Sequence, residues 1–209
     1  MSILNQLANA QVRKDDVPNR ELAKKIAKSQ DREGIQALVD NLANADKAIQ
    51  SDCIKTLYEV GYLDPSLIAG YWGSFLELLQ SNNNRLVWGG MIALSTIAHL
   101  RAAELFPHAR EIQQVVEAGS VITQDSGIRA LAAIAAQRDN YRSALLPYLF
   151  EVLKTCRAKD LPRHAEVVTK ALVDDALESW VEILDSRLPD LTASQQKRLK
   201  RTLKKARQA

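Results

Sequence analysis

Apolar residues recur through the middle of the chain at intervals of 37 residues. The first such column consists of Leu38, Phe75, Ile112 and Leu149. A second column follows four residues behind it, at Leu42, Leu79, Val116 and Leu153. A third contains Leu57, Leu94 and Leu131, and Leu172 follows after a further 41 residues. Self-similarity at a fixed period predicts a repeat protein whose units stack, because one unit alone cannot bury its apolar face.

Each repeat contains two segments in which apolar residues lie three and four positions apart, the spacing of one helical face. In the first repeat these segments cover residues 35–42 and 49–60. Turn-forming residues separate the two segments, for example Ala45-Asp46 and Gly119-Ser120. We therefore expect four helical hairpins over residues 34–174, an N-terminal cap at 1–33 and a C-terminal cap at 175–209, forming a single domain over 1–209.

The second segments also carry two columns of small residues. These are Cys53, Gly90 and Gly127, and then Thr56, Ala93, Ala130 and Ala171. Small side chains let helix axes approach closely. A glycine inside a helix costs about 1 kcal/mol relative to alanine, so we expect Gly90 and Gly127 where a side chain would clash.

With its paired helices and a small residue just before a leucine in the second helix, the stretch 34–172 resembles the HEAT-repeat (armadillo-like) family. The resemblance implies an all-α fold, an α-α superhelix or solenoid, and a role as a scaffold that binds other macromolecules. It departs from the family at the Asp–Arg ladder that often links neighbouring repeats. The early positions of the second helices are here Gln50, Val87, Gln124 and Ala165.

The termini and the fourth repeat carry their own boundary signals. Pro18 is expected in the first turn of a helix, and Asp31 is expected to cap the next one. An insertion near residues 156–162 predicts a longer loop in the fourth repeat. A helix over 176–187 and a last helix beginning at Thr192 or Ser194 complete the chain, and the repeat register and apolar spacing place Trp72 and Trp180 in the core.

The composition agrees with an aliphatic helical core, since 46% of the residues are hydrophobic and only 5% aromatic. The three histidines lack metal-ligand spacing, and Cys53 and Cys156 fall in different repeats. We therefore expect no metal or cofactor, and a reduced, cytoplasmic location. No stretch approaches 18 consecutive apolar residues, so no membrane span is expected.

The last segment is strongly basic although the whole chain has a formal net charge of only +3. It contains no acid among the cations Lys197, Arg198, Lys200, Arg201, Lys204, Lys205 and Arg207. One interpretation is an edge that binds phosphates or an acidic partner. The other is a solvated cap that closes the repeat array and keeps it soluble.

A second candidate site lies along the second helices, which in HEAT-like stacking line the concave surface. Its members are Lys55, Tyr58, Trp88, Ile92, Arg129 and Lys170. Aromatic and basic side chains of this kind form interface hot spots. The alternative is scattered surface charge, neutralised by nearby acids such as Asp52, with Trp88 packed between repeats.

The resulting hypothesis is a non-catalytic scaffold that holds a partner, most simply another protein, on the second-helix surface; the sequence leaves its oligomeric state open. The first alternative is nucleic-acid binding through the basic last helix and the second-helix groove. The second alternative is a HEAT-like DNA-repair glycosylase. That activity needs a carboxylate beside an exposed aromatic side chain, and the pair that the sequence offers is Asp125 with Trp88.

Overall fold

A computed structural model describes residues 3–13 and 15–208, and within those residues it contains helices and loops but no strand. The chain divides into two compact units, Met1–Ala130 and Leu131–Ala209, and each is described here by itself. The expected single domain over 1–209, with its two caps and four repeats, stays a prediction. Residues 1, 2, 14 and 209, which the expected caps include, lie outside the described part of the chain.

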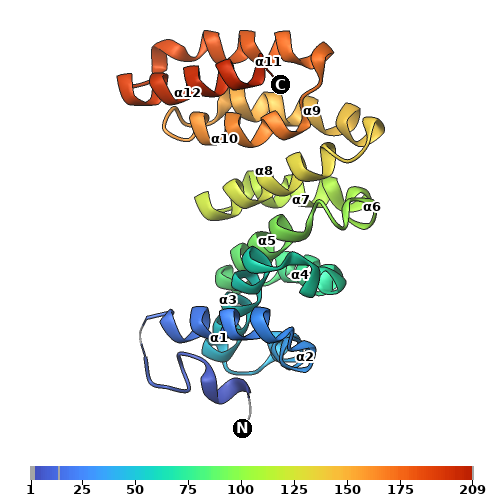
Figure 1. The fold of residues 1–209 in the computed structure, drawn as a ribbon, viewed down its shortest axis with the longest axis vertical. Coiled ribbons are helices and arrows are strands. Elements are labelled where there is room, and N and C mark those ends of the chain that lie inside the picture. Colours follow the sequence, from blue (N-terminus) through green and yellow to red (C-terminus); the bar gives the residue numbers. More distant parts are fainter. Residues whose placement is uncertain (1–2, 14, 209) are drawn as a thin grey trace. The chain divides into compact units, whose positions relative to one another are not determined.

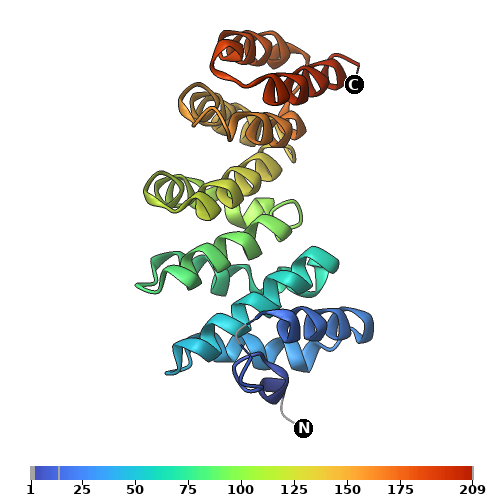
Figure 2. The same ribbon diagram turned by 90° about the vertical axis from the view of Figure 1, so that its left-hand side faces the viewer.

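The first unit is built from successive helical hairpins, coloured blue to green in Figures 1 and 2. Its α-helices are α1 (Val17–Ser29), α2 (Arg32–Asp40), α3 (Lys47–Leu63), α4 (Trp72–Glu77), α5 (Asn84–Ile97), α6 (Ala102–Leu105), α7 (Ala109–Ala118) and most of α8 (Val121–Ala135). Its 3₁₀ helices are η1 (Ile3–Gln6), η2 (Asn41–Ala43), η3 (Pro65–Leu67), η4 (Ala69–Tyr71), η5 (Leu78–Gln80) and η6 (Phe106–His108). Helix α3 packs against α1, α2 and α5, as the hairpin prediction requires.

The second unit holds the end of α8 and the remaining helices. These are α9 (Asp139–Thr155), α10 (Leu161–Val168), η7 (Thr169–Ala171), α11 (Asp174–Ser186), η8 (Leu188–Asp190) and α12 (Ala193–Ala206). Helices α10 and α11 each pack against both α9 and α12. Figure 1 shows α11 and α12 side by side, in orange and red. The loop between α9 and α10 falls at the predicted insertion.

Several helices begin at residues that favour the start of a helix and that can be recognised in the sequence. The Asp31 carboxylate accepts a hydrogen bond from the Gly34 amide at 2.8 Å, and Pro18 lies in the first turn of α1. Thr192 caps α12 in a reciprocal capping box with Gln195. The predictions for Pro18 and Asp31 are confirmed. The last helix, expected to begin at Thr192 or Ser194, begins at Ala193 with Thr192 as its cap.

The first helix of the second repeat differs from expectation because it is broken into short pieces. Two 3₁₀ turns, η3 and η4, precede α4, which begins only at Trp72. Trp72 therefore occupies a first turn rather than the interior of a continuous helix. The prediction that Trp72 is core was wrong: it is half-buried, with its ring centroid 6.0 Å from that of His108. Trp180, by contrast, is fully buried as predicted.

The small columns mark close helix packing. A Cβ added at Gly90 would lie 2.8 Å from the carbonyl oxygen of Phe75 and 2.9 Å from the Leu78 Cβ. One added at Gly127 would lie 2.1 Å from the Val116 side chain. All three distances are shorter than van der Waals contact, which confirms the clash expected at these two positions.

We expect Gly90→Ala to lower the free energy of unfolding by about 1–3 kcal/mol, because the added methyl group meets the backbone carbonyl of Phe75 in α4 and the Leu78 side chain of η5. The matched control is Gly73→Ala in α4, where a Cβ would meet nothing within 4 Å. That change should raise stability by about 0.4–1 kcal/mol through the unfolded state. Urea denaturation followed by circular dichroism measures both, and equal shifts for the two variants would contradict the packing argument.

Candidate functional site

The first unit contains a hollow of about 510 Å³ that brings together three of the predicted groove residues. Lys55 and Tyr58 reach it from α3, and Trp88 reaches it from α5. The remaining wall is formed by Ala8, Asn9, Arg13, Asp15, Asp16, Asn19, Ala48, Ser51, Asp52 and Arg85. The hollow therefore combines an aromatic side with a charged side.

The aromatic side is a packed cluster. The Tyr58 ring lies 6.2 Å from that of Trp88, tilted by 56°, and 6.1 Å from that of Tyr62, nearly perpendicular to it. Such tilted and edge-to-face pairs are preferred geometries for aromatic rings. Tyr58 is only 6% exposed, whereas Trp88 is half-buried and Tyr62 is exposed. Trp88 is thus held in place by Tyr58 while part of its side chain remains open to a ligand.

Lys55 is held at the centre of the charged side. Its ammonium lies 2.8 Å from Asp16 Oδ2, 2.6 Å from Glu59 Oε1 and 4.8 Å from the centroid of the Tyr58 ring. Burial disfavours the charge, but hydrogen bonds to Asp16 and Glu59 outweigh that effect and raise the pKa of Lys55. The same contact with Lys55 lowers the pKa of Asp16. Lys55 is therefore a fixed cation that positions its neighbours.

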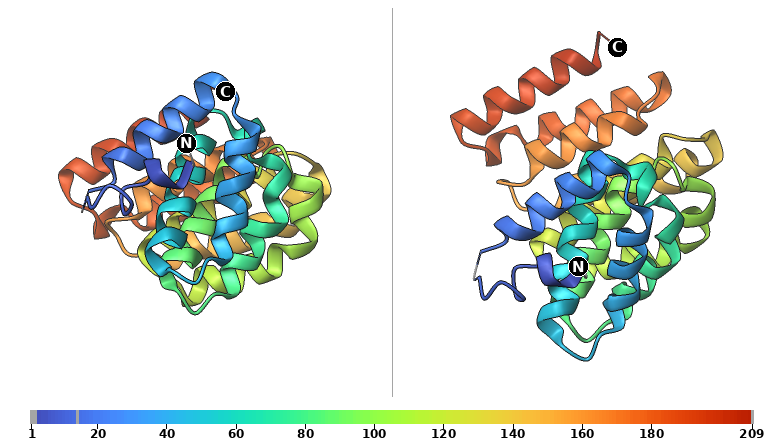
Figure 3. Two further views of the ribbon diagram at one scale, coloured as in Figure 1. Left: turned by 90° about the horizontal axis from the view of Figure 1, so that it is seen from below. Right: turned by 60° about the horizontal axis from the view of Figure 1, so that its bottom comes forward.

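The N-terminal segment is fastened to α3 through a buried amide. The Asn19 side chain, 1% exposed, accepts a hydrogen bond from the Ala8 amide at 2.9 Å and donates one to Asp52 at 2.7 Å. Asp52 also accepts from the Asn9 amide at 2.7 Å. Figure 3 shows this dark blue segment beside α1. The sequence pattern did not single out Ala8, Asn9 or Asn19, and it identified Asp52 only as a nearby neutralising acid.

The other predicted groove residues do not line this hollow. Ile92 is only 6% exposed, so its assignment to an accessible surface was wrong: residues 89–95 of α5 are buried on every side, and an apolar side chain there joins the core. Arg129 lies half-buried on α8 in the first unit. Lys170 is exposed on η7, in the second unit.

The carboxylates that share the hollow with Trp88 are Asp15, Asp16 and Asp52, whereas Asp125 lies on α8, outside its described lining. The three lining acids already have partners. A hydrogen bond from Arg13 lowers the pKa of Asp15, as the bond from Lys55 does for Asp16. Asp15 and Asp16 are therefore weak general bases, because efficient proton transfer requires a pKa near the working pH.

The cysteine thiols also show no sign of activation. Burial raises the pKa of Cys53 to about 12, and burial also raises the pKa of Cys156. Within residues 3–13 and 15–208, no group of three His, Cys, Asp or Glu side chains is arranged to hold a metal ion. Over the same residues, no helix has both the length and the apolar character needed to cross a membrane.

The predicted basic helix corresponds to α12. Its cations all lie exposed on the surface: Lys197, Arg198, Lys200, Arg201, Lys204 and Lys205, with Arg207 just beyond the helix. Arg198 forms a two-pronged contact with Glu166, at 2.8 and 2.5 Å. That contact lowers the pKa of Glu166 and raises that of Arg198. Whether α12 binds a partner or only caps the fold stays a prediction at this point.

Comparison with known proteins defines the class of fold. No family model matches the sequence, and no curated protein matches it. An engineered protein of known structure is 18% identical, and the match covers 100% of this chain and 98% of that one with a TM-score of 0.67. A designed armadillo repeat protein in complex with the peptide (KR)4 is 14% identical, with 88% and 85% covered and a TM-score of 0.64.

A third structure, of computationally designed armadillo repeat proteins for modular peptide recognition, is 16% identical, with 97% of each chain covered and a TM-score of 0.60. The chain therefore has an armadillo-like, HEAT-like helical repeat fold, as the sequence periodicity predicted. At these identities the likeness establishes the fold alone.

Proposed function

We propose that the protein is a non-catalytic scaffold that holds an extended segment of another protein in the hollow of the first unit. The observation that carries the proposal is the half-buried Trp88, braced by Tyr58, beside a charged wall. Large aromatic side chains held rigidly in a partly open pocket are the usual anchors of protein interfaces. A helical repeat fold with a bound peptide, as in one of the similar structures, supports an extended chain as the type of ligand.

Arg85 supplies the polar contact beside this anchor. It is exposed on the first turn of α5 and lines the same hollow as Trp88. Among residues 3–13 and 15–208 its guanidinium has no acidic partner, whereas Lys55 in the same hollow has two. A guanidinium donates hydrogen bonds in a planar fork that suits a carboxylate or a backbone carbonyl. The ligand therefore places an apolar side chain against Trp88 and an acceptor oxygen at Arg85.

A catalytic role has less support. The glycosylase alternative requires a carboxylate that can act as a base beside the aromatic side chain. The carboxylates beside Trp88 are committed to Arg13, Lys55, Asn19 and backbone amides. The hydrogen bonds from Arg13 and Lys55 lower the pKa values of Asp15 and Asp16 and so reduce the basicity of these two carboxylates.

The test is selection of peptides from a random library displayed on phage against the purified full-length chain, followed by fluorescence anisotropy with the selected peptides. We expect Trp88→Ala to weaken binding by about 30-fold or more, the loss of roughly 2 kcal/mol that defines a hot spot. Arg85→Ala should weaken it by about tenfold, equivalent to one charge-assisted hydrogen bond.

Two matched controls lie in the same unit but outside the hollow. Trp72→Ala removes another half-buried indole, and Arg110→Ala removes another exposed helix arginine. Both variants should retain wild-type affinity. The proposal is abandoned if folded Trp88→Ala protein binds the selected peptides as tightly as wild type does, or if the Trp72 control loses as much affinity.

A further inference from the structure

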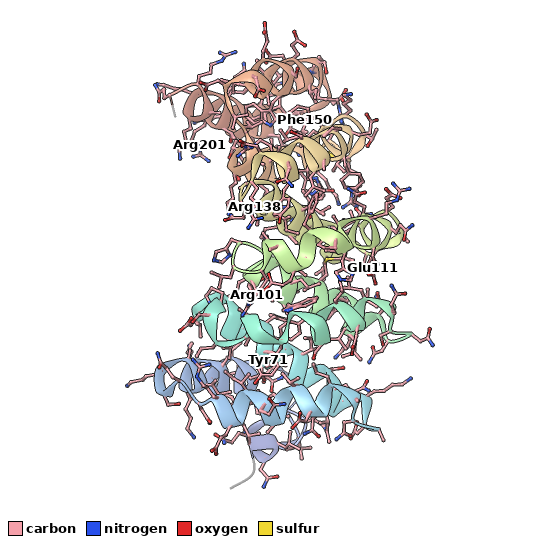
Figure 4. All side chains as sticks on the ribbon, turned by 90° about the vertical axis from the view of Figure 1, so that its right-hand side faces the viewer. Tyr71, Arg101, Glu111, Arg138, Phe150 and Arg201 are labelled. Carbon is pink, nitrogen blue, oxygen red and sulfur yellow. The ribbon has the colours of Figure 1, made fainter. Side chains whose placement is uncertain are left out.

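A second hollow, of about 670 Å³, lies wholly within the second unit, beside α12. Its aliphatic part consists of Leu172, Val173 and Leu177, from the start of α11 and the residues just before it. Arg201 and Lys205 border it from α12, one helical turn apart. Figure 4 labels Arg201 at the surface of this unit.

The charge of α12 is strictly one-sided. Its buried residues are Leu199, Thr202 and Leu203, which face the rest of the unit. At 100° per residue, the six cations of α12 from Lys197 to Lys205 fall on the opposite half of the helix. Lys200 and Lys204 lie on the flank away from the hollow, where they border a different depression with Asp185 and Leu188. The helix thus presents two basic flanks, of which only one borders the aliphatic hollow.

The cations beside the hollow are available to a ligand. Glu166, which also lines the hollow, is engaged by Arg198. In the described part of the chain, neither Arg201 nor Lys205 forms an ion pair. The remaining acid at the hollow is Asp174, in the first turn of α11, where the helix dipole stabilises its charge. The unit as a whole has fifteen Lys and Arg against ten Asp and Glu.

We propose that this hollow binds an acidic segment of a partner protein that inserts an aliphatic side chain against Leu172, Val173 and Leu177. The acidic groups of the segment pair with Arg201 and Lys205. The positive charge of Arg201 and Lys205 favours an anionic ligand. The aliphatic lining of the hollow favours an acidic peptide over a nucleic acid. Proteins that bind single-stranded nucleic acid stack bases on aromatic side chains. None of the described residues that line this hollow is aromatic.

The site shares no lining residue with the hollow in the first unit, and its test distinguishes binding at the two hollows. The probes are a fluorescein-labelled peptide of glutamates containing two leucines, an all-glutamate peptide of the same length, and a single-stranded oligonucleotide. Anisotropy is measured on the full-length chain at about 0.15 M salt, where interactions between exposed charges are screened beyond about 8 Å. We expect the leucine-containing peptide to bind at least about tenfold more tightly than either other probe.

The deciding comparison is between two variants with the same change of charge on the same helix. Arg201→Gln combined with Lys205→Gln should weaken binding of the leucine-containing peptide by at least about tenfold. Lys200→Gln with Lys204→Gln, on the other flank, should weaken it by less than about threefold. Trp88→Ala should leave this binding unchanged. Circular dichroism confirms that each variant is folded, and the four exchanged α12 side chains are all exposed.

Several results would overturn the proposal. Equal losses in the two double variants would mean that the basic face attracts anions without a defined site. Tighter binding of the oligonucleotide than of the leucine-containing peptide would assign α12 to nucleic acid instead. Equal affinity for the two peptides would show that the aliphatic hollow does not contribute to binding. Failure of both peptides to bind would reject the site.

Discussion

Replacing Trp180 by alanine is expected to lower the free energy of unfolding by about 3–5 kcal/mol, the usual cost of removing a large aromatic side chain from a core. Trp180 is fully buried on α11, and that helix packs against both α9 and α12. Its loss leaves a cavity in the core of the second unit. Because the indole nitrogen has no hydrogen-bond partner among residues 3–13 and 15–208, the expected loss comes from packing rather than from a broken polar contact.

The matched control is Trp72→Ala, the same substitution at a half-buried position in the other unit. About half of that loss is expected there, since less apolar surface leaves water at this site on folding. Urea denaturation measures both variants. Equal destabilisation at the two positions would show that burial does not set the cost.

Replacing Arg187 by methionine is expected to cost about 2–3 kcal/mol, the value of a charged hydrogen-bond donor whose acceptors are left behind. The Arg187 guanidinium donates to the carbonyl oxygens of Leu153 and Cys156, each at 2.9 Å, and to that of Lys154. These carbonyls lie at the C-terminal end of α9, where no further helical amide can reach them. The arginine therefore caps α9 from a distant part of the chain.

The control for this prediction is Arg157→Met, in which an exposed arginine side chain loses its ion pair with the buried carboxylate of Asp160. This change should cost about 1 kcal/mol, less than Arg187→Met, because the buried carboxylate is not left without an ion pair. Asp160 keeps its contact with Arg163 in that variant. Thermal and urea unfolding of the two variants give the comparison. If Arg187→Met were as mild as Arg157→Met, water would be an adequate cap for α9.

Sequence periodicity was sufficient to predict the helical hairpins, because the repeated apolar columns are set by local helical geometry. Capping residues such as Asp31 and Thr192 are equally local, and the small-residue column that contains Gly90 and Gly127 indicates close packing directly. The break before α4 was missed. A 37-residue register assumes that each first helix is continuous, and it says nothing about the short 3₁₀ turns between Pro65 and Tyr71.

The candidate site could be predicted only in part. Lys55, Tyr58 and Trp88 do come together, because they occupy related positions on adjacent second helices. The prediction that Ile92 is accessible was wrong because α5 is buried on nearly all its faces. That burial depends on the neighbouring helices and cannot be seen in the apolar pattern of α5 itself. Burial of Tyr58 has a similar origin, since its ring packs between Trp88 and Tyr62.

The N-terminal wall of the hollow was missed for a different reason. It depends on hydrogen bonds between residues that are 11 to 43 positions apart, and such pairs leave no periodic trace. One local signal was present: Asn19 lies three residues before Leu22, on the inward face of α1. A buried polar side chain must find partners, so its position indicates a network there.

The hydrogen bonds of Asn19 and Asp52 have a consequence for how a partner meets the first unit. They hold Ala8 and Asn9 against α1 and α3 in the folded chain itself, with no ligand needed to order them. Preorganisation of this kind removes much of the entropic cost of association. The rate at which a segment enters the hollow is then governed by diffusion and orientation, and differences in affinity among partners emerge in their residence times.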